Sequence, residues 1–324
     1  MSVAIVISQP GGPEVLKAIE RVLNEPGPDE VQIQHEVIGV NFVDIYYRSG
    51  LYLQSSYPVV PGFEGGGRVT AVGHKVGAFS PGDRVAYTGN PMGAYAEFRN
   101  IPASRVVKLP NGVDIRTAGS SMLRGLTAHM LLYKVRKVKA GDWILVHSAA
   151  GGLGQIVTRW ATMKGARVIG TTSSAGKVKI AQTAGAVEVL LHTDTAWAEA
   201  VREIADGRGV HLAIDGIGGT MLSSTLSVVR PFGIVASLGQ PAGPIPPVRV
   251  EDLGFARSIA LIRPSSIAYT DDADLYKQGA EDLITALQNG LENPVGAEYA
   301  LTDAAKAHTD LEAGRTTGSV ILTV

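Results

Sequence analysis

The stretch WILVHSAAGGLG, residues 143–154, decides the fold. Its apolar first part, 143–147, predicts a buried strand, and the small residues at 149–154 predict a tight turn. A helical segment at 155–164 and a second apolar run at 166–171 follow. The order of strand, tight turn, helix and strand is that of one βαβ unit.

The turn has the form A-x-G-x-x-G, in which an alanine takes the first glycine position. Small residues let the backbone approach a pyrophosphate, and the helix N-terminus directs N–H groups and a partial positive charge toward it. Such a pattern alone also occurs in ordinary tight loops, but its place between a strand and a helix favours nucleotide binding. The residues predicted to contact the nucleotide in this turn are Gly151, Gly152, Leu153 and Gly154.

The same alternation continues through the second half of the chain. Apolar runs separated by segments long enough for helices predict a parallel sheet with helices on both faces. Six strands fit the doubly wound order 3-2-1-4-5-6, with a ligand at the carboxyl ends of the strands. The predicted strands lie at 143–147, 166–171, 187–191, 210–215, 233–238 and 258–262, and the helices at about 117–134, 152–164, 175–184, 196–205, 219–229 and 272–289.

Residues 1–122 contain short apolar runs divided by Gly, Pro, Asn and Asp, a pattern typical of a compact barrel or sandwich. One helix is predicted within this region, at 42–49. The tail is short-stranded again and is expected to return to the first domain. We therefore predict an α/β chain of two domains: a β-rich domain of residues 1–122 and 290–324, and a doubly wound domain of residues 123–289.

The composition restricts the function. A net charge of −1 over 324 residues gives no electrostatic case for nucleic acid or an anionic membrane as the main partner. The chain has no cysteine, which excludes disulfides and thiol chemistry, and its seven histidines include no close pair at metal-ligand spacing. No apolar run reaches the length of a membrane span, and the N-terminus lacks a signal-peptide pattern. We expect a cytoplasmic protein without a bound metal.

The residues around the turn indicate which dinucleotide is preferred. A site for NAD usually has an acidic residue at the end of the second strand, where it binds the ribose hydroxyl. No Asp or Glu occurs between residues 143 and 187. Hydroxyl groups and an ammonium would instead hold the extra phosphate of NADPH, and the candidates are Thr172, Ser173, Ser174 and Lys177. Lys164 and Lys179 are interpreted as parts of a solvated helix face.

Several further motifs follow one another along the chain. They lie at 11–16, 39–52, 61–67, 81–85, 125–128, 149–154, 215–218, 263–265 and 316–318. Together they resemble the zinc-free NADPH:quinone oxidoreductases of the medium-chain dehydrogenase/reductase superfamily, and the likeness covers essentially the whole chain. The resemblance implies a GroES-like β-barrel domain, a Rossmann domain, a homodimer and a cleft between the two domains.

Two positions depart from the zinc-dependent members of that superfamily. Those relatives carry a cysteine where this chain has Asn41 and a histidine where it has Phe63. Loss of both ligands removes the basis for Lewis-acid catalysis. Glu64 remains and is interpreted as a structural residue.

Two further departures concern the cofactor. Many quinone reductases have an adenine-facing tyrosine where this chain has His192, whose ring could stack there or belong to a surface loop. Near the end of the chain, Gly314 replaces the arginine often seen before Thr-Thr-Gly. Arg315 is next in line and is a candidate phosphate contact.

The resemblance also places residues around the nicotinamide. It implies that Thr127 and the run Leu238, Gly239 and Gln240 lie by that half of the cofactor, and that Asn41 and Val43 close the pocket from the barrel side.

Tyr46 and Tyr52 are the substrate-side candidates, because each offers a flat apolar face and a hydroxyl that can bond a carbonyl oxygen. Packing of the helix onto the barrel is the alternative role for both. Arg263 could polarise a substrate oxygen, hold phosphate or form a structural ion pair.

The resulting hypothesis is NADPH-dependent, metal-independent reduction of quinones by hydride transfer. A close alternative is reduction of the C=C bond of enones or 2-alkenals by the same hydride step. A rival from another class is a non-enzymatic NADPH- or RNA-binding protein of the crystallin type, which the near-neutral charge disfavours for RNA.

Overall fold

The chain folds into two units in the computed structural model, which describes residues 1–255 and 257–324. Unit 1 consists of Met1–Leu126 and Ser266–Val324, and unit 2 consists of Thr127–Ser265. Within the described residues, no helix combines the length and the apolar character that crossing a membrane requires.

Unit 2 is built on a parallel sheet whose strand order confirms the predicted 3-2-1-4-5-6. All four residues of its first strand are buried, as expected for a strand covered on both faces. The strands are β8 (Trp143–Val146), β9 (Arg167–Thr172), β10 (Glu188–Leu191), β11 (Val210–Asp215), β12 (Val229–Ser237) and β13 (Ala260–Ile262), and the helices are α4 (Gly152–Met163), α5 (Val178–Thr183), α6 (Trp197–Ile204) and α7 (Met221–Leu226).

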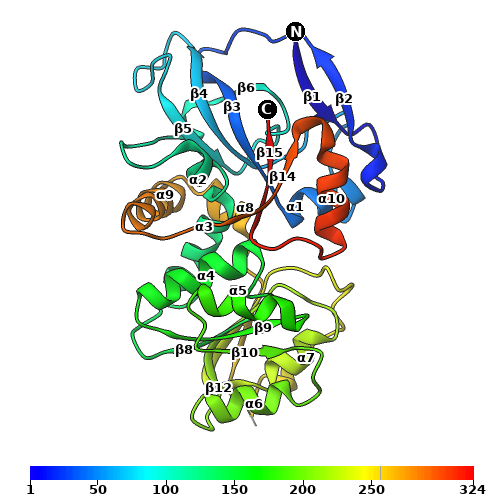
Figure 1. The fold of residues 1–324 in the computed structure, drawn as a ribbon, viewed down its shortest axis with the longest axis vertical. Helices are drawn as coiled ribbons and strands as arrows, with labels where there is room; N and C mark the ends of the chain where they lie inside the picture. The colour runs from blue at the N-terminus through cyan, green and yellow to red at the C-terminus, as the bar shows by residue number, and fades with distance from the viewer. Residues whose placement is uncertain (256) are drawn as a thin grey trace. The chain divides into compact units, whose positions relative to one another are not determined.

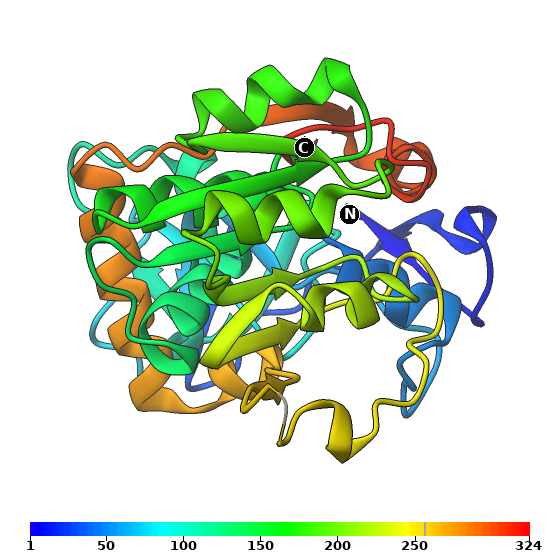
Figure 2. The ribbon, with the colours of Figure 1, turned by 90° about the horizontal axis from the view of Figure 1, so that it is seen from below.

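Helices cover both faces of this sheet, so the unit is doubly wound (Figures 1 and 2). In Figure 1, α4 and α5 lie on one face, and α6 and α7 lie on the other. The core between one face and its helices contains Trp143, Leu145, Ile169, Trp197 and Val201, all of them buried. These side chains come from the apolar runs that the sequence marks as strands and from the inner face of α6.

Unit 1 contains a seven-stranded sheet in the order β14-β15-β3-β4-β5-β7, with β6 also paired to β3. The tail returns to this unit as predicted, because β15 pairs antiparallel with β3 and parallel with β14. Figure 1 shows the C-terminal strand, in red, beside the blue strands. The strands of this sheet are β3 (Glu30–Val40), β4 (Glu64–Val72), β5 (Arg84–Thr88), β6 (Phe98–Pro102), β7 (Val106–Lys108), β14 (Val295–Ala300) and β15 (Ser319–Thr323). A separate two-stranded sheet consists of β1 (Ser2–Val6) and β2 (Lys17–Arg21).

The helices of unit 1 include two that the sequence had placed in the other domain. They are α1 (Phe42–Ser49), α2 (Ile115–Gly119), α8 (Ser266–Asp271), α9 (Ala273–Gln288) and α10 (Ala304–Glu312), and α3 (Met122–His129) spans the boundary between the units. The predicted limit at 289 therefore differs from the observed one at 265. The cause is tertiary: the Tyr276 hydroxyl donates to the carbonyl of Arg105 at 2.6 Å, and the Arg105 guanidinium donates to that of Thr270 at 2.7 Å.

The single helix predicted at 117–134 is divided into α2, α3 and a π-helical segment, Met130–Val135. Its interruption follows from close packing against β4. A Cβ atom on Gly119 would lie only 2.5 Å from the backbone nitrogen of Gly66, so this approach requires glycine. The Ser120 hydroxyl then donates to the carbonyl of Arg116 at 2.8 Å and occupies the end of α2.

Candidate functional site

The turn after β8 is held against the neighbouring strand by its own backbone. The N–H of Ala149 donates to the carbonyl of Thr171 at 3.0 Å, and that of Gly151 donates to Ser148 at 2.9 Å. A Cβ atom on Gly154 would lie 2.3 Å from the Ser148 oxygen, which explains the need for glycine there. Among the described residues no side chain caps the start of α4 at Gly151, so the first-turn N–H groups remain available to an anion.

The end of β9 carries the hydroxyl groups that the sequence predicted. Thr172 is buried and its hydroxyl donates to the carbonyl of Ser174 at 3.1 Å, whereas Ser173 and Ser174 are exposed. Lys177 follows at the end of a short 3-10 turn, Ala175–Lys177. The structure therefore brings these four residues together at one strand end.

His192 belongs to the same group. Its backbone N–H donates to the carbonyl of Thr172 at 3.1 Å. Burial, and then the nearby Lys177 ammonium, lower the pKa of the His192 imidazole, so the ring is neutral near pH 7. Its Nδ1 is buried and has no hydrogen-bond partner among the described residues. A neutral, half-buried ring at this position suits stacking or a hydrogen bond to a ligand.

A second group of predicted residues lies at the carboxyl ends of β12 and β13. The N–H of Leu238 donates to the carbonyl of Asp215 at 2.7 Å, which fixes the run 238–240 beside β11. The Arg263 guanidinium donates to the Ser237 hydroxyl at 3.2 Å and to the Gln240 amide oxygen at 3.3 Å. Arg263 is exposed, so its donor groups lie at the rim of this strand edge.

Asp215 lies under that edge and was not predicted. Burial raises the pKa of its carboxyl, and the N–H groups of Gly218 and Ile217 and the Arg263 charge oppose this effect. Thr127, the remaining nicotinamide-side candidate of unit 2, is a buried residue of α3.

The substrate-side candidates of unit 1 are organised by the start of α1. Asn41 precedes the helix, its N–H donates to the Asp44 carboxylate at 2.7 Å, and its side-chain amide donates to Glu64 at 2.7 Å. Val43 is half-buried in the first turn of the helix. Tyr46 is one turn further along and is 8% exposed.

An aromatic cluster follows from α1 and the loop after it. The rings of Tyr46 and Tyr52 lie 5.2 Å apart, and the N–H of Tyr52 donates to the carbonyl of Tyr46 at 3.0 Å. Tyr47, which the sequence reasoning passed over, packs against Tyr52 at 5.6 Å and against Phe63 at 5.2 Å. The available signal was three tyrosines within seven residues, Tyr46, Tyr47 and Tyr52, but periodicity alone could not say which rings meet.

Glu64 holds the structural role that the sequence suggested. It is fully buried and accepts hydrogen bonds from Asn41, from the N–H of Leu123 at 2.7 Å and from Arg124 at 3.0 Å. Phe63 beside it is also fully buried. Across the described part of the chain, no group of three or more His, Cys, Asp or Glu side chains is arranged to hold a metal ion.

Arg315 belongs to unit 1 and has a carboxylate partner. Its Nε lies 2.7 Å from Asp310, whose other oxygen accepts from the Tyr299 hydroxyl at 2.7 Å. A phosphate contact by Arg315 would have to compete with this ion pair, which weakens the prediction made from the sequence.

A buried polar chain beneath α1 was also missed. The Tyr95 hydroxyl lies 3.2 Å from Asp44 and 2.9 Å from Nε2 of His308. Burial raises the pKa of the Asp44 carboxyl to about 7 and lowers that of His308 to about 3. Asn41 and Asp44 have the spacing of a helix-capping pair, and this spacing was the sequence signal for Asp44, the first residue of the buried polar group.

The fold and these two sets of residues define the class of the two-domain, nicotinamide-dependent dehydrogenases and reductases. Residues 27–111 match the family "Alcohol dehydrogenase GroES-like domain", and residues 152–282 match "Zinc-binding dehydrogenase". A quinone oxidoreductase of Pseudomonas aeruginosa is 38% identical over 313 residues, which cover 96% of each chain. A 2-haloacrylate reductase of a Burkholderia species is 38% identical over an alignment of 330 positions, which covers 99% of each chain.

Among solved structures, the quinone oxidoreductase of Escherichia coli complexed with NADPH superposes with a TM-score of 0.95 at 34% identity, covering 99% of this chain and 100% of that one. The chain belongs to the medium-chain dehydrogenase/reductase superfamily, within its quinone oxidoreductase family. The expected GroES-like and Rossmann-type folds are thereby confirmed.

The tight turn provides a test of the site's construction. We expect Gly154→Ala to lower the thermal midpoint of unfolding by a few degrees, because the new methyl group meets the Ser148 and Ala149 backbone. Overpacking of this kind costs about 1–3 kcal/mol. Gly77→Ala is the control, since no atom of the described residues lies within 4 Å of a Cβ atom there. Equal midpoints for the two variants in calorimetry would contradict this account of the turn.

Proposed function

We propose that the chain is an NADPH-dependent oxidoreductase that reduces quinones by hydride transfer without a metal. The observation that carries the proposal is the end of β9, where Thr172, Ser173, Ser174 and Lys177 gather in a stretch of 45 residues, 143–187, that lacks any acidic side chain. The likeness to quinone oxidoreductases over nearly the whole chain supports the same conclusion.

The residues of unit 2 fit the cofactor. The uncapped start of α4 would receive the pyrophosphate, and Lys177 with the hydroxyl groups of β9 would receive the ribose phosphate. His192, whose buried Nδ1 lacks a partner among the described residues, would pack by the adenine. Thr127 and the run 238–240 would orient the nicotinamide, and bound NADPH would supply the hydride.

The residues of unit 1 fit an uncharged, flat electrophile. Asn41 is held by Glu64 and Asp44, so its position is fixed before any substrate arrives. Tyr46 and Tyr52 would offer ring faces and hydroxyl donors to a carbonyl oxygen. A tyrosine hydroxyl or solvent would provide the proton that the reduced quinone requires. Asn41 and Phe63 stand where zinc-dependent relatives carry metal ligands, which supports a metal-free reaction.

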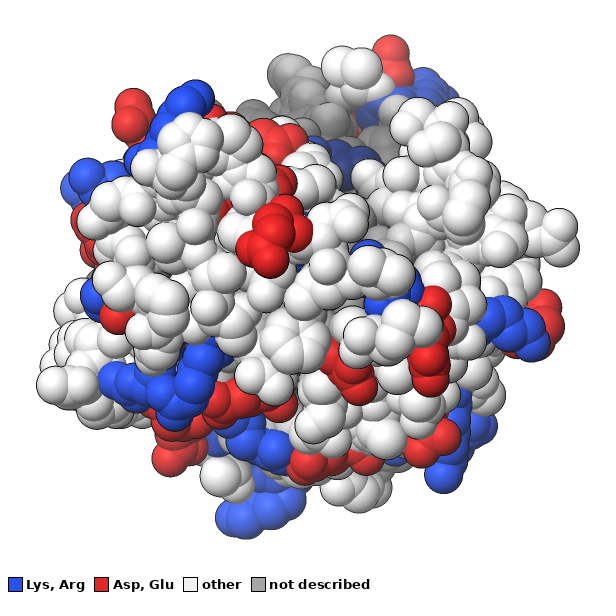
Figure 3. Space-filling view, turned by 90° about the horizontal axis from the view of Figure 1, so that it is seen from above, with Lys and Arg blue, Asp and Glu red and all other residues white. Residues whose placement is uncertain are grey.

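A specific observation favours a second function. The 2-haloacrylate reductase of Burkholderia is as similar to this chain as the quinone oxidoreductase of Pseudomonas. Reduction of an activated C=C bond uses the same hydride donor as quinone reduction. It also requires a polarised carbonyl group. A nucleic-acid-binding role has no comparable support, because Lys and Arg are interspersed with Asp and Glu on the face shown in Figure 3.

The activity is tested by following NADPH oxidation against a panel of quinones and a panel of enones. We expect turnover with quinones that persists after treatment with a metal chelator, because no step needs a Lewis acid. Turnover with enones only would select the C=C reductase. Binding of NADPH without turnover in either panel would overturn both proposals in favour of a binding protein.

Lys177 tests the cofactor preference. We expect Lys177→Ala to raise the KM for NADPH roughly tenfold while the KM for NADH changes less than about twofold, since one charge-assisted phosphate contact is lost. Lys179→Ala is the matched control, because Lys179 is an exposed residue of α5. Parallel changes with both cofactors, or the same change in both variants, would remove Lys177 from the phosphate site.

The homodimer that the family resemblance implies has a candidate surface in unit 2. Within the part of the chain that the structure describes, β13 pairs with β12 alone and forms the edge of the sheet. Phe232, Val250 and Phe255 are exposed apolar residues of the same unit, at 85%, 78% and 106% exposure. An open strand edge with exposed apolar side chains favours pairing with a second copy.

Sedimentation velocity tests this surface. We expect the unaltered chain to sediment as a dimer and Ile262→Asp, on β13, to sediment as a monomer, because a charge at the paired edge would be buried. Leu53→Asp, at a 90% exposed residue of unit 1, is the control and should remain dimeric. A monomeric unaltered chain would disprove the assembly.

A further inference from the structure

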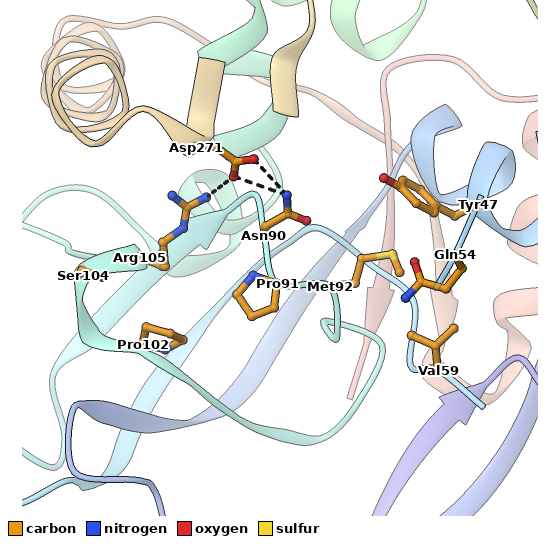
Figure 4. Close-up of a pocket in the computed structure, with 10 residues that line it drawn as sticks. All are labelled: Tyr47, Gln54, Val59, Asn90, Pro91, Met92, Pro102, Ser104, Arg105 and Asp271. Carbon is orange, nitrogen blue, oxygen red and sulfur yellow. Dashed lines mark hydrogen bonds and ion pairs between the residues drawn. The ribbon is translucent and has the colours of Figure 1, made fainter. Parts of the chain in front are cut away.

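Unit 1 contains a pocket of about 610 Å³ that the proposed catalytic residues do not account for. Residues from α1, from the loop after it, from the segment between β5 and β6, and from the end of α8 line it (Figure 4). This volume lies within the range of pockets that take small organic molecules, roughly 300–1,000 Å³. It is large enough for more than one ring.

One side of the pocket is apolar and aromatic. Figure 4 shows Tyr47, Met92 and Val59 on this side, with the amide of Gln54 among them. An aromatic ring, a thioether and a branched aliphatic side chain favour contact with an apolar ligand, and methionine adapts to ligands of irregular shape.

The other side is polar but neutral as a group. Among the described residues that line the pocket, only Arg105 and Asp271 are charged, and they form an ion pair at 3.5 Å. The Asn90 amide nitrogen donates to Asp271 at 3.1 Å, and Figure 4 shows its carbonyl oxygen on the opposite side. The guanidinium also donates through Nη1 to the carbonyl of Thr270, whereas its buried Nε and, apart from this ion pair, its Nη2 lack a hydrogen-bond partner among the described residues. The two charges of this ion pair cancel, so the described lining has no net charge, which favours an uncharged ligand.

Tyr47 connects the pocket to the substrate-side tyrosines. Its ring packs edge-on against Tyr52, which in turn contacts Tyr46 at 5.2 Å. Burial, and then Tyr52 and Asp271, raise the pKa of the Tyr47 phenol, so the hydroxyl remains a hydrogen-bond donor at neutral pH. Tyr47 therefore belongs both to the lining of the pocket and to the aromatic cluster of Tyr46 and Tyr52, and all three residues lie in unit 1.

We propose that this pocket is a subsite that takes the uncharged, apolar substituent of a substituted quinone and that Met92 sets its preference. The substrate class is then an alkyl-substituted quinone rather than a bare ring. This inference rests on the proposed quinone reduction, because it assigns the second part of the same substrate.

The test compares two quinones that differ only in the substituent, para-benzoquinone and pentyl-para-benzoquinone. Met92→Trp fills the pocket, and we expect it to lower kcat/KM for the pentyl quinone about tenfold, chiefly through KM. The value for para-benzoquinone should stay within about twofold. Met163→Trp, at a half-exposed methionine on α4, is the matched control and should change neither value.

Met92→Ala provides a second variant if the larger side chain disturbs folding. It should widen the pocket and shift the preference toward longer alkyl chains, while thermal unfolding reports whether each variant folds. An equal loss for both quinones, or no loss for either in a folded Met92→Trp protein, would overturn the subsite.

Direct measurement of ligand binding distinguishes failure of the proposed function from failure of the proposed subsite. If the unaltered enzyme reduces neither of these quinones nor any other quinone of the panel, the proposed quinone reduction is refuted, and the affinity for pentyl-para-benzoquinone is then measured by equilibrium dialysis. Weaker binding by Met92→Trp than by Met163→Trp would still support the pocket as an apolar ligand site. Equal binding by the two variants would refute it.

Discussion

The buried carboxylate of Glu64 is the constraint on which unit 1 depends. It accepts hydrogen bonds from Asn41 at the end of β3 and from Leu123 and Arg124 of α3, and so it ties two elements to β4. Gly39 leaves the space for it, since a Cβ atom there would lie 2.0 Å from the carboxylate. Loss of one partner from a buried ion pair costs about 3–5 kcal/mol. Because Asn41 also begins α1, the same group fixes the tyrosines that we assign to the substrate.

The fold was readable from the sequence wherever the signal was local. Apolar runs that alternate with helical segments predicted the strand order of unit 2. The strands were recognisable because parallel strands buried on both faces are continuous apolar runs in the sequence. β2 gives no such local signal, because four of its five residues are exposed and show no alternation. The placement of α8 and α9 in unit 1 depends on contacts such as that of Tyr276 with Arg105, which are 171 residues apart and leave no local trace.

The candidate site divides in the same way. The turn at 149–154 and the hydroxyl-rich end of β9 form short motifs, and the sequence therefore marked them together. Arg315 and its partner Asp310 are also close in sequence. The order of charged residues along the sequence does not indicate which carboxylate the guanidinium pairs with. The polar side of the unit 1 pocket joins Asn90 to Asp271 across 181 residues, and only folding brings such a group into view.

The pairing of β15 with β3 has a consequence for folding during translation. A ribosome releases the N-terminal strands of unit 1 first, yet β3 gains this neighbour only when Ser319–Thr323 has emerged. Unit 2 is continuous from Thr127 to Ser265, so its sheet can be completed while the tail is still being translated. The unit that begins the chain is therefore the last to finish folding, and until then the edge of β3 that β15 covers stays unpaired and open to pairing with another chain.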